Sequence, residues 1–367
     1  MSEPIRVLVV DDTVVYRKIM SDILNGFPDL EVVGTAVNGK IALDKIMNLK
    51  PDLVTLDIEM PLMGGLEVLA QLKKRKIDTR VIVVSAVTSD GADATMKAME
   101  LGAKTFFTKP TGRNIEESKK ILYDQIMPVI KGIISRIRVR SFISGKSPVP
   151  TEAFTSKKYV TEIGSVSQRM EKITGKIKPE IIAIGVSTGG PLALARVLTL
   201  IPASFKLPIV IVQHMPPIFT KALADSLDKK SDLTVVEAEH DQILKSGFAY
   251  IAPGGRQMKL KKRDNGQTQI IITDDPPENH CKPAADYLFR SVSLQYYSNA
   301  VGVIMTGMGR DGTLGLRLMK RRGAYVIAQD EITSVVFGMP QEAIKAGVVD
   351  KVVPDTGIAQ EIIRLVN

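Results

Sequence analysis

Short runs of Val, Ile and Leu alternate with amphipathic stretches through the first 110 residues, and this alternation restricts the fold more than any other feature. Near-continuous apolar runs between helical segments are typical of βαβ units, whose parallel sheet is buried on both faces. Five such repeats predict one doubly wound α/β domain. The strands are expected at residues 5–10, 31–37, 52–56, 81–84 and 104–107.

A second α/β pattern begins at Pro179. The strands expected in its main sheet are 180–185, 208–213, 300–305 and 324–328. Three shorter strands, separated by turns, are expected at 248–251, 257–261 and 269–273. An Asp-Asn-Gly sequence lies between the last two of these and is a hairpin signal. We therefore expect a second doubly wound, mostly parallel α/β domain that carries an antiparallel hairpin.

A strongly basic segment separates the two patterns. Residues 131–178 contain eleven Lys or Arg and three Glu, a charge of +8, whereas the formal charge of the whole chain is +9. A basic, aromatic-poor stretch with Ser, Thr and Pro favours a solvated linker. A nucleic-acid-binding arm is the alternative, but no helix-turn-helix or zinc-finger pattern accompanies the segment.

The domain boundaries follow from these patterns. A helix is expected from about Asn114, and Pro128 should kink or break it. With 367 residues, the chain is long enough for two ordinary domain cores. We expect a first domain at 1–112, a helix and basic linker at 113–178, and a second domain at 179–367.

Composition excludes several classes of protein. No apolar run approaches the roughly 20 residues of a membrane span, and the N-terminus lacks the pattern of a signal peptide. Cys281 is the single cysteine, so the chain has no internal disulfide, as is usual in a reducing compartment. We expect a cytoplasmic protein without membrane insertion.

Acidic and basic residues gather at the predicted strand ends of the first domain. These ends carry Asp11, Asp12, Asp57, Ser85 and Lys109. Because the carboxyl ends of parallel strands meet at one edge, three carboxylates would converge there and repel one another unless a cation binds between them. Oxygen ligands without His or Cys favour Mg²⁺. A carboxylate beside Mg²⁺ and a lysine can accept a phosphoryl group, since both cations neutralise the developing charge.

This constellation, over about residues 5–110, resembles the receiver domain of response regulators, which has a (βα)5 fold. The resemblance implies that Asp57 is phosphorylated. It also implies that Asp11, Asp12, Asp57 and the backbone carbonyl of Glu59 hold Mg²⁺. The alternative is that these strand-end acids merely cap the helices that follow.

The same resemblance assigns the residues that respond to phosphorylation. Ser85 and Phe106 would be the switch pair, together with Lys109, and the Lys109–Pro110 peptide bond would be cis.

Three strand ends of the second domain carry a serine, a histidine and an aspartate. Ser187 lies in a glycine-rich strand–helix turn, which on its own is also consistent with phosphate binding or a simple turn. His214 and Asp311 each follow another predicted strand, so all three are expected on one rim of one sheet. Together they supply a nucleophile, a base and an orienting carboxylate, as acyl transfer needs. The second domain is therefore expected to be hydrolase-like.

Other residues are weaker candidates. His240 and His280 are the rival bases, and both are expected to be surface or loop histidines. Cys281 is expected to be an ordinary loop cysteine, because no glycine turn of the oxyanion type lies beside it. The order Ser, His, Asp differs from the Ser, Asp/Glu, His order of the α/β-hydrolase fold, so the triad would be an independent one.

Six motifs of the second domain closely resemble the chemotaxis protein-glutamate methylesterase family: GVSTGGP, QHMPPIFT, IAPGGRQM, PPENH–ADYLFRS, MTGMGRDG and VFGMP. The resemblance implies that Ser187 is the nucleophile, His214 the general base and acid, and Asp311 the residue that orients His214. The backbone N–H groups of Thr188 and Met308 would form the oxyanion hole.

The resemblance also implies the substrate. Glutamyl methyl esters on the cytoplasmic helices of a chemoreceptor would be hydrolysed to glutamate and methanol, and particular glutamines would be deamidated. A chemotaxis histidine kinase would be the phosphodonor that activates the enzyme during adaptation. No cofactor for the esterase and no nucleic-acid partner are implied. Gln257, His240 and Gln242 depart from the family pattern, and we expect them to alter the substrate groove.

Two other functions remain open on the sequence. The receiver-like domain could regulate a hydrolase that acts on a different ester or amide. Alternatively, the chain could be a phosphate-dependent adaptor whose triad is vestigial. Methanol release from methylated receptor separates the first of these from a receptor methylesterase.

Overall fold

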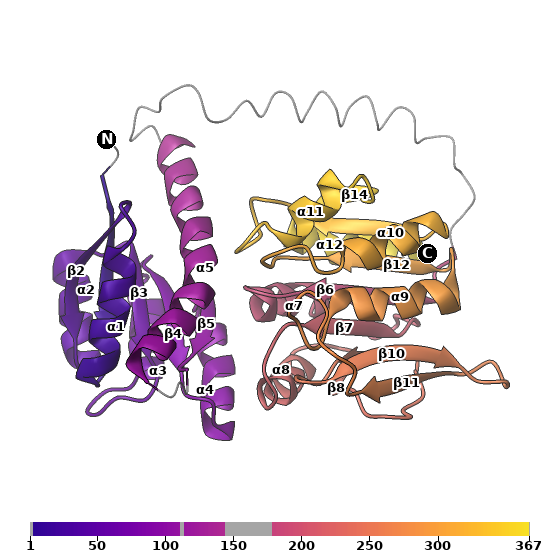
Figure 1. Cartoon of the computed structure of the whole chain (residues 1–367), viewed down its shortest axis with the longest axis horizontal. Coiled ribbons are helices and arrows are strands. Elements are labelled where there is room, and N and C mark those ends of the chain that lie inside the picture. Colours follow the sequence, from indigo (N-terminus) through magenta and orange to yellow (C-terminus); the bar gives the residue numbers. More distant parts are fainter. Residues whose placement is uncertain (1–2, 111–113, 144–177, 367) are drawn as a thin grey trace.

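The computed structural model describes residues 3–110, 114–143 and 178–366, which form two α/β units (Figure 1). The basic segment predicted at 131–178 begins within a described helix that ends at Ile143, and its residues 144–177 lie outside the described residues. None of the described helices combines the length and the apolar character needed to cross a membrane.

The first unit is built on a parallel five-stranded sheet in the order β2-β1-β3-β4-β5. Each predicted strand is confirmed to within one residue. The strands are β1 (Ile5–Val10), β2 (Leu30–Ala36), β3 (Leu53–Asp57), β4 (Arg80–Ser85) and β5 (Thr105–Thr108).

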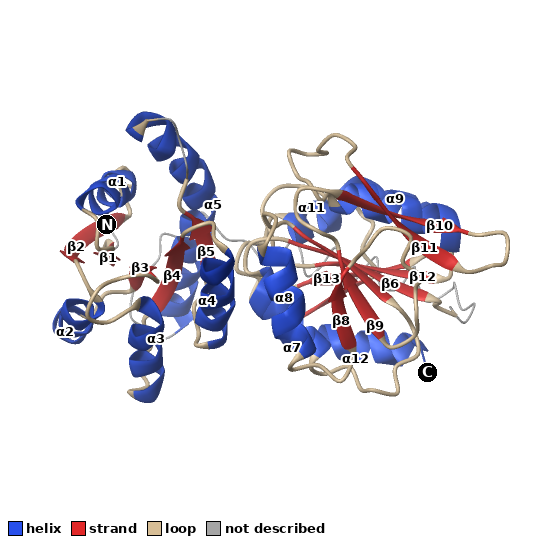
Figure 2. Ribbon diagram, turned by 90° about the horizontal axis from the view of Figure 1, so that it is seen from below, coloured by secondary structure: helices blue, strands red, loops and turns tan. Residues whose placement is uncertain are grey.

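Helices cover both faces of this sheet, as Figure 2 shows. One face is covered by α1 (Val14–Asn25) and α5 (Ile115–Ile143), and the other by α2 (Gly39–Leu49), α3 (Gly65–Lys74) and α4 (Ser89–Glu100). Successive strand residues point to opposite faces. Val7 and Val9 of β1 accordingly join the α1 and α5 core, whereas Leu8 and Val10 join the α2–α4 core.

The sequence predicted that Pro128 would kink or break this helix, and the prediction of a break is wrong because α5 continues from Ile115 to Ile143. Proline in a helix interior costs about 3 kcal/mol, because a hydrogen bond is lost and the ring clashes with the preceding turn. Ile126 and Ile130, on either side of it, are buried. Burial of each such side chain contributes about 1.5–3 kcal/mol, which offsets the cost of the proline.

The second unit has a parallel seven-stranded sheet in the order β14-β13-β12-β6-β7-β9-β8. All the predicted strands are present to within one residue, namely β6 (Ile181–Val186), β7 (Ile209–Gln213), β9 (Phe248–Ile251), β10 (Gln257–Lys262), β11 (Thr268–Thr273), β12 (Ala300–Ile304) and β13 (Tyr325–Gln329). Strands β10 and β11 form the expected antiparallel hairpin. Strand β9 instead pairs in parallel with β7 and β8. The short strands β8 (Thr234–Glu237) and β14 (Lys351–Val353) were not predicted.

The two faces of this sheet bury different layers (Figure 2). Ile182 and Ile184 of β6 belong to the core beneath α7 (Gly190–Leu198), α8 (Phe219–Asp228) and α12 (Asp355–Val366). Ile181 and Ala183 face the opposite core, which is formed by α9 (Ala285–Tyr296), α10 (Thr313–Arg321), α11 (Met339–Lys345) and the β10–β11 hairpin. Because β6 is apolar on both faces, it can lie in the middle of the sheet.

The chain changes direction at β6. It proceeds from β6 to β7 and to the β8 edge, and later returns to the other side of β6 to form β12. In open α/β sheets, ligands bind at the carboxyl ends of the strands where the order reverses. The residues that follow β6, β7 and β12 therefore occupy the expected ligand crevice.

The two units contact each other through α4, β5 and α5. The Phe106 ring stacks on the Phe219 ring of α8, with centroids 5.2 Å apart. Glu100 accepts a hydrogen bond from Ser226 Oγ at 2.8 Å and lies 2.5 Å from Lys230 Nζ. On α5, Gly132 lies so close to the Val335 carbonyl that an added Cβ would be 3.0 Å from its oxygen.

Phe289 provides a test of the second core. Its side chain is buried against Gly185, Gly312 and Gly315, and Phe289→Ala would leave a cavity between α9, α10 and β6. We expect the free energy of unfolding of the second unit to fall by about 3–5 kcal/mol, measured by urea denaturation. Leu294→Ala on the same helix is the control, because Leu294 is 48% exposed and should change stability by less than about 0.5 kcal/mol.

Candidate active site and phosphoacceptor site

The acidic residues of the first unit do converge at the carboxyl end of the sheet. Single carboxylate oxygens of Asp11, Asp12 and Asp57 all lie within 4.8 Å of one another. Lys109 Nζ lies 2.6 Å from Asp57 Oδ2 and 2.9 Å from Asp11 Oδ2. Its ammonium also lies 4.9 Å from the centre of the Tyr16 ring. The arrangement places one cation against two buried carboxylates.

The negative charge of this crevice favours binding of a second cation. Burial raises the pKa of Asp57 to about 6, and Asp11 adds to the shift, although the hydrogen bond and charge of Lys109 oppose it. Two carboxylates in one low-dielectric site resist full ionisation when a single ammonium compensates them. Three oxygen ligands within this distance suit a hard divalent ion such as Mg²⁺.

The remaining receiver residues predicted from the sequence lie around this crevice. Ser85 is buried at the end of β4, and its Oγ donates to the Gly91 carbonyl at 3.2 Å. Glu59 is exposed, and its N–H points to Asp57 Oδ1 at 3.4 Å. Phe106 is half-buried at the interface with α8.

The predicted cis bond between Lys109 and Pro110 is wrong. The cis peptide bond among the described residues is Lys282–Pro283. Bonds before proline favour trans by about 0.5–1 kcal/mol, and Tyr16 donates its hydroxyl to the Pro110 carbonyl at 3.1 Å.

Phosphorylation is expected to require both Asp57 and Mg²⁺. Asp57→Asn should take no label from a small-molecule phosphodonor, and chelation should block labelling of the unchanged protein. Since the pKa of Asp57 is raised to about 6, the carboxylate is charged above that value, and Mg²⁺ affinity should fall as the pH drops through 6. Equal labelling of Asp57→Asn would mean that a different residue accepts the phosphoryl group.

In the second unit, the three predicted residues meet at one rim of the sheet. Ser187 follows β6 directly, and its N–H donates to the Thr306 carbonyl beyond β12 at 2.9 Å. His214 follows β7, and its N–H donates to the Val186 carbonyl at 3.1 Å. The backbone thus continues the β12-β6-β7 pairing for one more step, which places Ser187 between the other two strand ends.

Asp311 is held rigidly and bonded to His214. His214 Nε2 and Asp311 Oδ2 are 2.7 Å apart. The same carboxylate accepts the N–H groups of Ala285 and Asp286 at 2.6 and 3.1 Å. These are the first residues of α9, so the positive end of that helix stabilises the carboxylate. Asn279 Nδ2 donates to Asp311 Oδ1 at 2.9 Å.

These contacts shift the pKa values in opposite directions. Burial by itself would lower the pKa of His214, but hydrogen bonds with Asp311 and Cys281 outweigh it and raise the pKa to about 9. Burial would raise the pKa of Asp311, yet the His214 hydrogen bond and the two α9 N–H groups hold it below its usual value. The pair is therefore arranged to stabilise an imidazolium beside a carboxylate, as proton transfer from a nucleophile requires.

The turn after Ser187 depends on glycine. Gly189 has φ +81°, and a Cβ there would be 2.4 Å from Val335 Cγ2. A Cβ on Gly190 would be 1.8 Å from Gln213 Oε1. The backbone N–H groups of Thr188 and Met308 donate to no other described residue. Both N–H groups thus remain available for a substrate oxygen.

Two sequence departures have different structural roles. Gln257 is fully buried, donates to the Pro276 carbonyl and accepts from the Ala284 N–H, so it fixes the loop that precedes α9. His240 is exposed and lines a hollow of about 490 Å³ with Glu239, Pro253, Arg256 and Ile272. None of the three rim residues lines this hollow.

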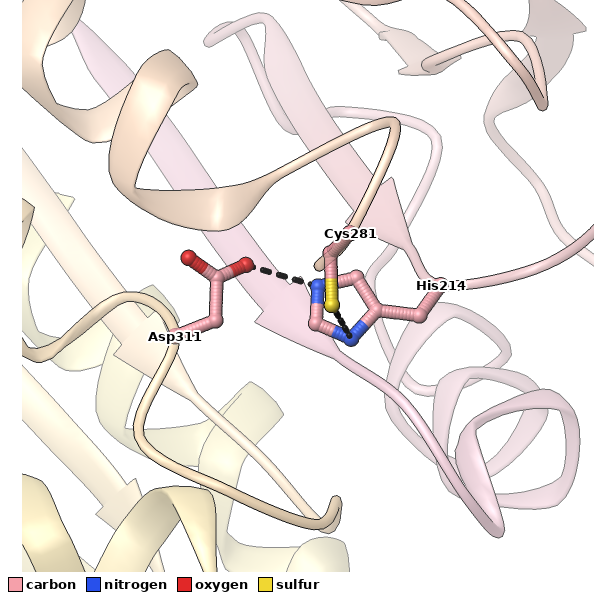
Figure 3. Close-up of side chains that lie close together, drawn as sticks. All are labelled: His214, Cys281 and Asp311. Atoms are coloured by element: carbon pink, nitrogen blue, oxygen red, sulfur yellow. Dashed lines mark hydrogen bonds and ion pairs between the residues drawn. The ribbon is translucent and has the colours of Figure 1, made fainter. Parts of the chain in front are cut away.

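Sequence reasoning missed the position of Cys281. Its Sγ lies 3.6 Å from His214 Nδ1, on the ring nitrogen opposite Asp311 (Figure 3). The sequence favoured a plain loop cysteine over a thiol nucleophile, and Cys281 does lie in a loop, but that loop places it beside His214. His280, by contrast, is exposed as expected. The one available signal was that the only cysteine of the chain lies within a motif that resembles a family active-site segment.

By these observations, the chain consists of a receiver-type domain followed by a hydrolase-type α/β domain. Residues 182–362 match the model of the CheB methylesterase family, and residues 7–120 match that of the response regulator receiver domain. The chain therefore belongs to the CheB methylesterase family of chemotaxis enzymes.

Individual relatives agree over the full length. A protein from Desulfotalea psychrophila, named protein-glutamate methylesterase/protein-glutamine glutaminase, is 48% identical over 364 residues, covering 99% of each chain. A protein of the same name from Thermotoga maritima is 40% identical and covers 99% of this chain and 98% of its own. The crystal structure of the Thermotoga maritima CheB methylesterase catalytic domain matches with 43% identity and a TM-score of 0.50, covering 52% of this chain and all of that one.

Proposed function

We propose that this protein hydrolyses glutamate methyl esters on the cytoplasmic helices of chemoreceptors, with a Ser187–His214–Asp311 triad that phosphorylation of Asp57 activates. The observation that carries the proposal is the 2.7 Å contact between His214 and Asp311 at the strand end next to Ser187. The names of the full-length relatives support both methylesterase and glutaminase activity.

The catalytic steps follow from the contacts at the rim. Ser187 Oγ attacks the ester carbonyl carbon, and His214 accepts the proton on Nδ1, because Nε2 is occupied by Asp311. The N–H groups of Thr188 and Met308 stabilise the tetrahedral oxyanion. His214 then returns the proton to the methoxide, and methanol leaves. Water, deprotonated by His214, hydrolyses the acyl-enzyme and releases glutamate.

Deamidation of glutamine uses the same groups. The carbonyl carbon of the amide is attacked in the same way, and His214 protonates the departing nitrogen so that ammonia leaves. Both reactions produce a glutamate side chain on the receptor, which accounts for two activities at one site.

The receiver supplies the regulation. Asp11, Asp12, Asp57 and the Glu59 carbonyl would hold Mg²⁺, which neutralises charge during phosphoryl transfer from a histidine kinase. Phosphorylation adds about −1.5 to −2 charges at Asp57. Ser85 then binds the phosphate, and Phe106 reorients.

The contacts between the two units support a route from the receiver to the esterase. Phe106 stacks on Phe219, the first residue of α8, which begins five residues after His214. Val335, which lies against α5, also contacts the Gly189 turn. The resting receiver thus lies against both sides of the catalytic rim and obstructs an approaching receptor helix. A bias of about 1.4 kcal/mol toward separation raises the rate tenfold.

The rates of methanol release by the triad variants should follow a definite order. Ser187→Ala and His214→Ala should each reduce methanol release from methylated receptor membranes by about 10⁴-fold or more, and the double variant should be little worse, because the residues act as a unit. Asp311→Asn should lose less, since Asp311 only orients and stabilises the imidazolium. Near-normal methanol release by Ser187→Ala would exclude Ser187 as the nucleophile.

The pH dependence gives an independent check. A general base must be neutral, so with the pKa of His214 raised to about 9, kcat/KM should rise with pH up to about 9. Asp311→Asn removes the charge that raises this pKa, and its residual activity should reach half-maximum at a lower pH. An unchanged pH profile in Asp311→Asn would contradict the coupling of Asp311 to His214.

A fragment of residues 179–367 should hydrolyse receptor esters faster than the intact unphosphorylated protein and should ignore phosphodonors. The crystallised catalytic domain of the Thermotoga relative indicates that such a fragment folds. Should the fragment fold yet work no faster than the intact resting chain, the receiver is an activator or docking module and not a lid.

A charge exchange tests the same interface in the intact chain. Lys230→Glu places a second carboxylate beside Glu100. Because a partly exposed ion pair contributes up to about 1 kcal/mol, its loss should raise the resting rate by up to about fivefold. Glu100→Lys combined with Lys230→Glu restores opposite charges and should return the rate toward its original value. A double variant as active as Lys230→Glu would argue against the pair.

A further inference from the structure

The catalytic histidine has a thiol on its second ring nitrogen. Cys281 Sγ lies 3.6 Å from His214 Nδ1, while Nε2 is bonded to Asp311 (Figure 3). Nδ1 is the nitrogen that accepts the proton of Ser187 in the mechanism above. Any group that binds between this nitrogen and the sulfur would therefore compete with catalysis.

Backbone hydrogen bonds of a tight turn fix the position of Cys281. Glu278 and Cys281 exchange two backbone hydrogen bonds, of 3.1 and 2.8 Å, around a tight turn. Asn279 and His280 in that turn have φ of +50° and +63°. Asn279 is anchored in addition to the carboxylates of Asp311 and Asp286, each at 2.9 Å. The thiol is thus held in place by the same carboxylate that orients the histidine.

The separation of the two atoms matches that of two ligands on one metal ion. With Zn–N of about 2.05 Å, Zn–S of about 2.3 Å and a tetrahedral angle, the nitrogen and sulfur are about 3.6 Å apart. We propose that His214 Nδ1 and Cys281 Sγ form an inhibitory site for a soft divalent cation of the Zn²⁺ type. A thiolate and an imidazole favour such ions over Mg²⁺, in contrast to the all-oxygen crevice at Asp57.

The surroundings complete the requirements of such a site. Histidines that bind metals generally donate their other ring N–H to a carboxylate, which fixes the tautomer, and Asp311 occupies that position behind His214. One carboxylate oxygen of Asp311, the Cys281 sulfur and one ring nitrogen of His214 all lie within 4.8 Å of one another. The thiol loses its proton when the ion binds, so the thiolate and the Asp311 carboxylate together balance a charge of +2. Water fills the remaining coordination positions.

The consequence for the enzyme is reversible inactivation. An ion on Nδ1 removes the lone pair that accepts the serine proton, so ester hydrolysis stops while the receiver can still be phosphorylated. This inhibition rests on the proposed role of His214, whereas binding of the ion does not.

The test uses the intact protein, Zn²⁺ and Co²⁺. Zn²⁺ binding is measured by competition with a chromophoric chelator, and Co²⁺ should give a thiolate-to-metal charge-transfer band, which only Cys281 can supply because it is the sole cysteine. Zn²⁺, but not Mg²⁺, should inhibit methanol release, and chelation should restore it. Since loss of an outer partner already weakens metal sites 10–100-fold, Cys281→Ser should raise both the dissociation constant and the inhibitory concentration by about 100-fold or more.

Two controls separate this site from others. His280→Ala removes the exposed neighbouring imidazole and should leave Zn²⁺ binding and inhibition as they are. Asp57→Asn weakens the receiver crevice and should leave the cobalt band in place. Absence of the band, or inhibition of Cys281→Ser at the same Zn²⁺ concentration as the original protein, would overturn the proposal. A protein that binds Zn²⁺ through Cys281 but releases no methanol would support the site and refute the proposed function.

Discussion

The buried hydrogen bond between Asp311 and His214 is the interaction on which the catalytic half of this protein depends. A carboxylate with 2% exposure is costly unless it is paired and hydrogen-bonded. Here the cost is offset by His214, the N-terminus of α9 and the amide of Asn279. That one carboxylate therefore joins the loop after β12, the loop after β7, the turn at Glu278–Cys281 and helix α9. Losing this carboxylate would remove the contacts that hold these four segments together.

Both functional crevices have the same origin in the fold. Parallel strands deliver every carboxyl end to one edge, so residues far apart in sequence meet without any local motif. In the first unit this edge collects carboxylates and a lysine, which create a site for hard cations and phosphate. In the second it collects a hydroxyl, an imidazole and a carboxylate at the reversal beside β6. The chemistry of the two crevices differs because different side chains, three or four in each unit, follow the carboxyl ends of otherwise apolar strands.

The sequence was sufficient for features that repeat along the chain. The strands were predicted correctly because apolar runs between helical segments have one common explanation, and Asp57, Ser187, His214 and Asp311 were proposed because each lies at or shortly after the end of such a run. The turn at Asn279 and His280 was not predicted, because the preference of Asn and His for left-handed backbone is too weak to locate a turn. The contact of Cys281 with His214 spans 67 residues and depends on that turn. Likewise, α5 continues through residue 128 because tertiary burial outweighs a local helix-breaking preference.

The ring stack between Phe106 and Phe219 restricts which receiver domains could replace the present one. A receiver taken from an unrelated response regulator could retain every residue expected to accept a phosphoryl group, yet present a different face to α8 and lose this contact. The aromatic pair, with Glu100 and Lys230 beside it, makes the contact specific to these two domain surfaces. A substitution on one side of this contact is therefore expected to require a matching substitution on the other side.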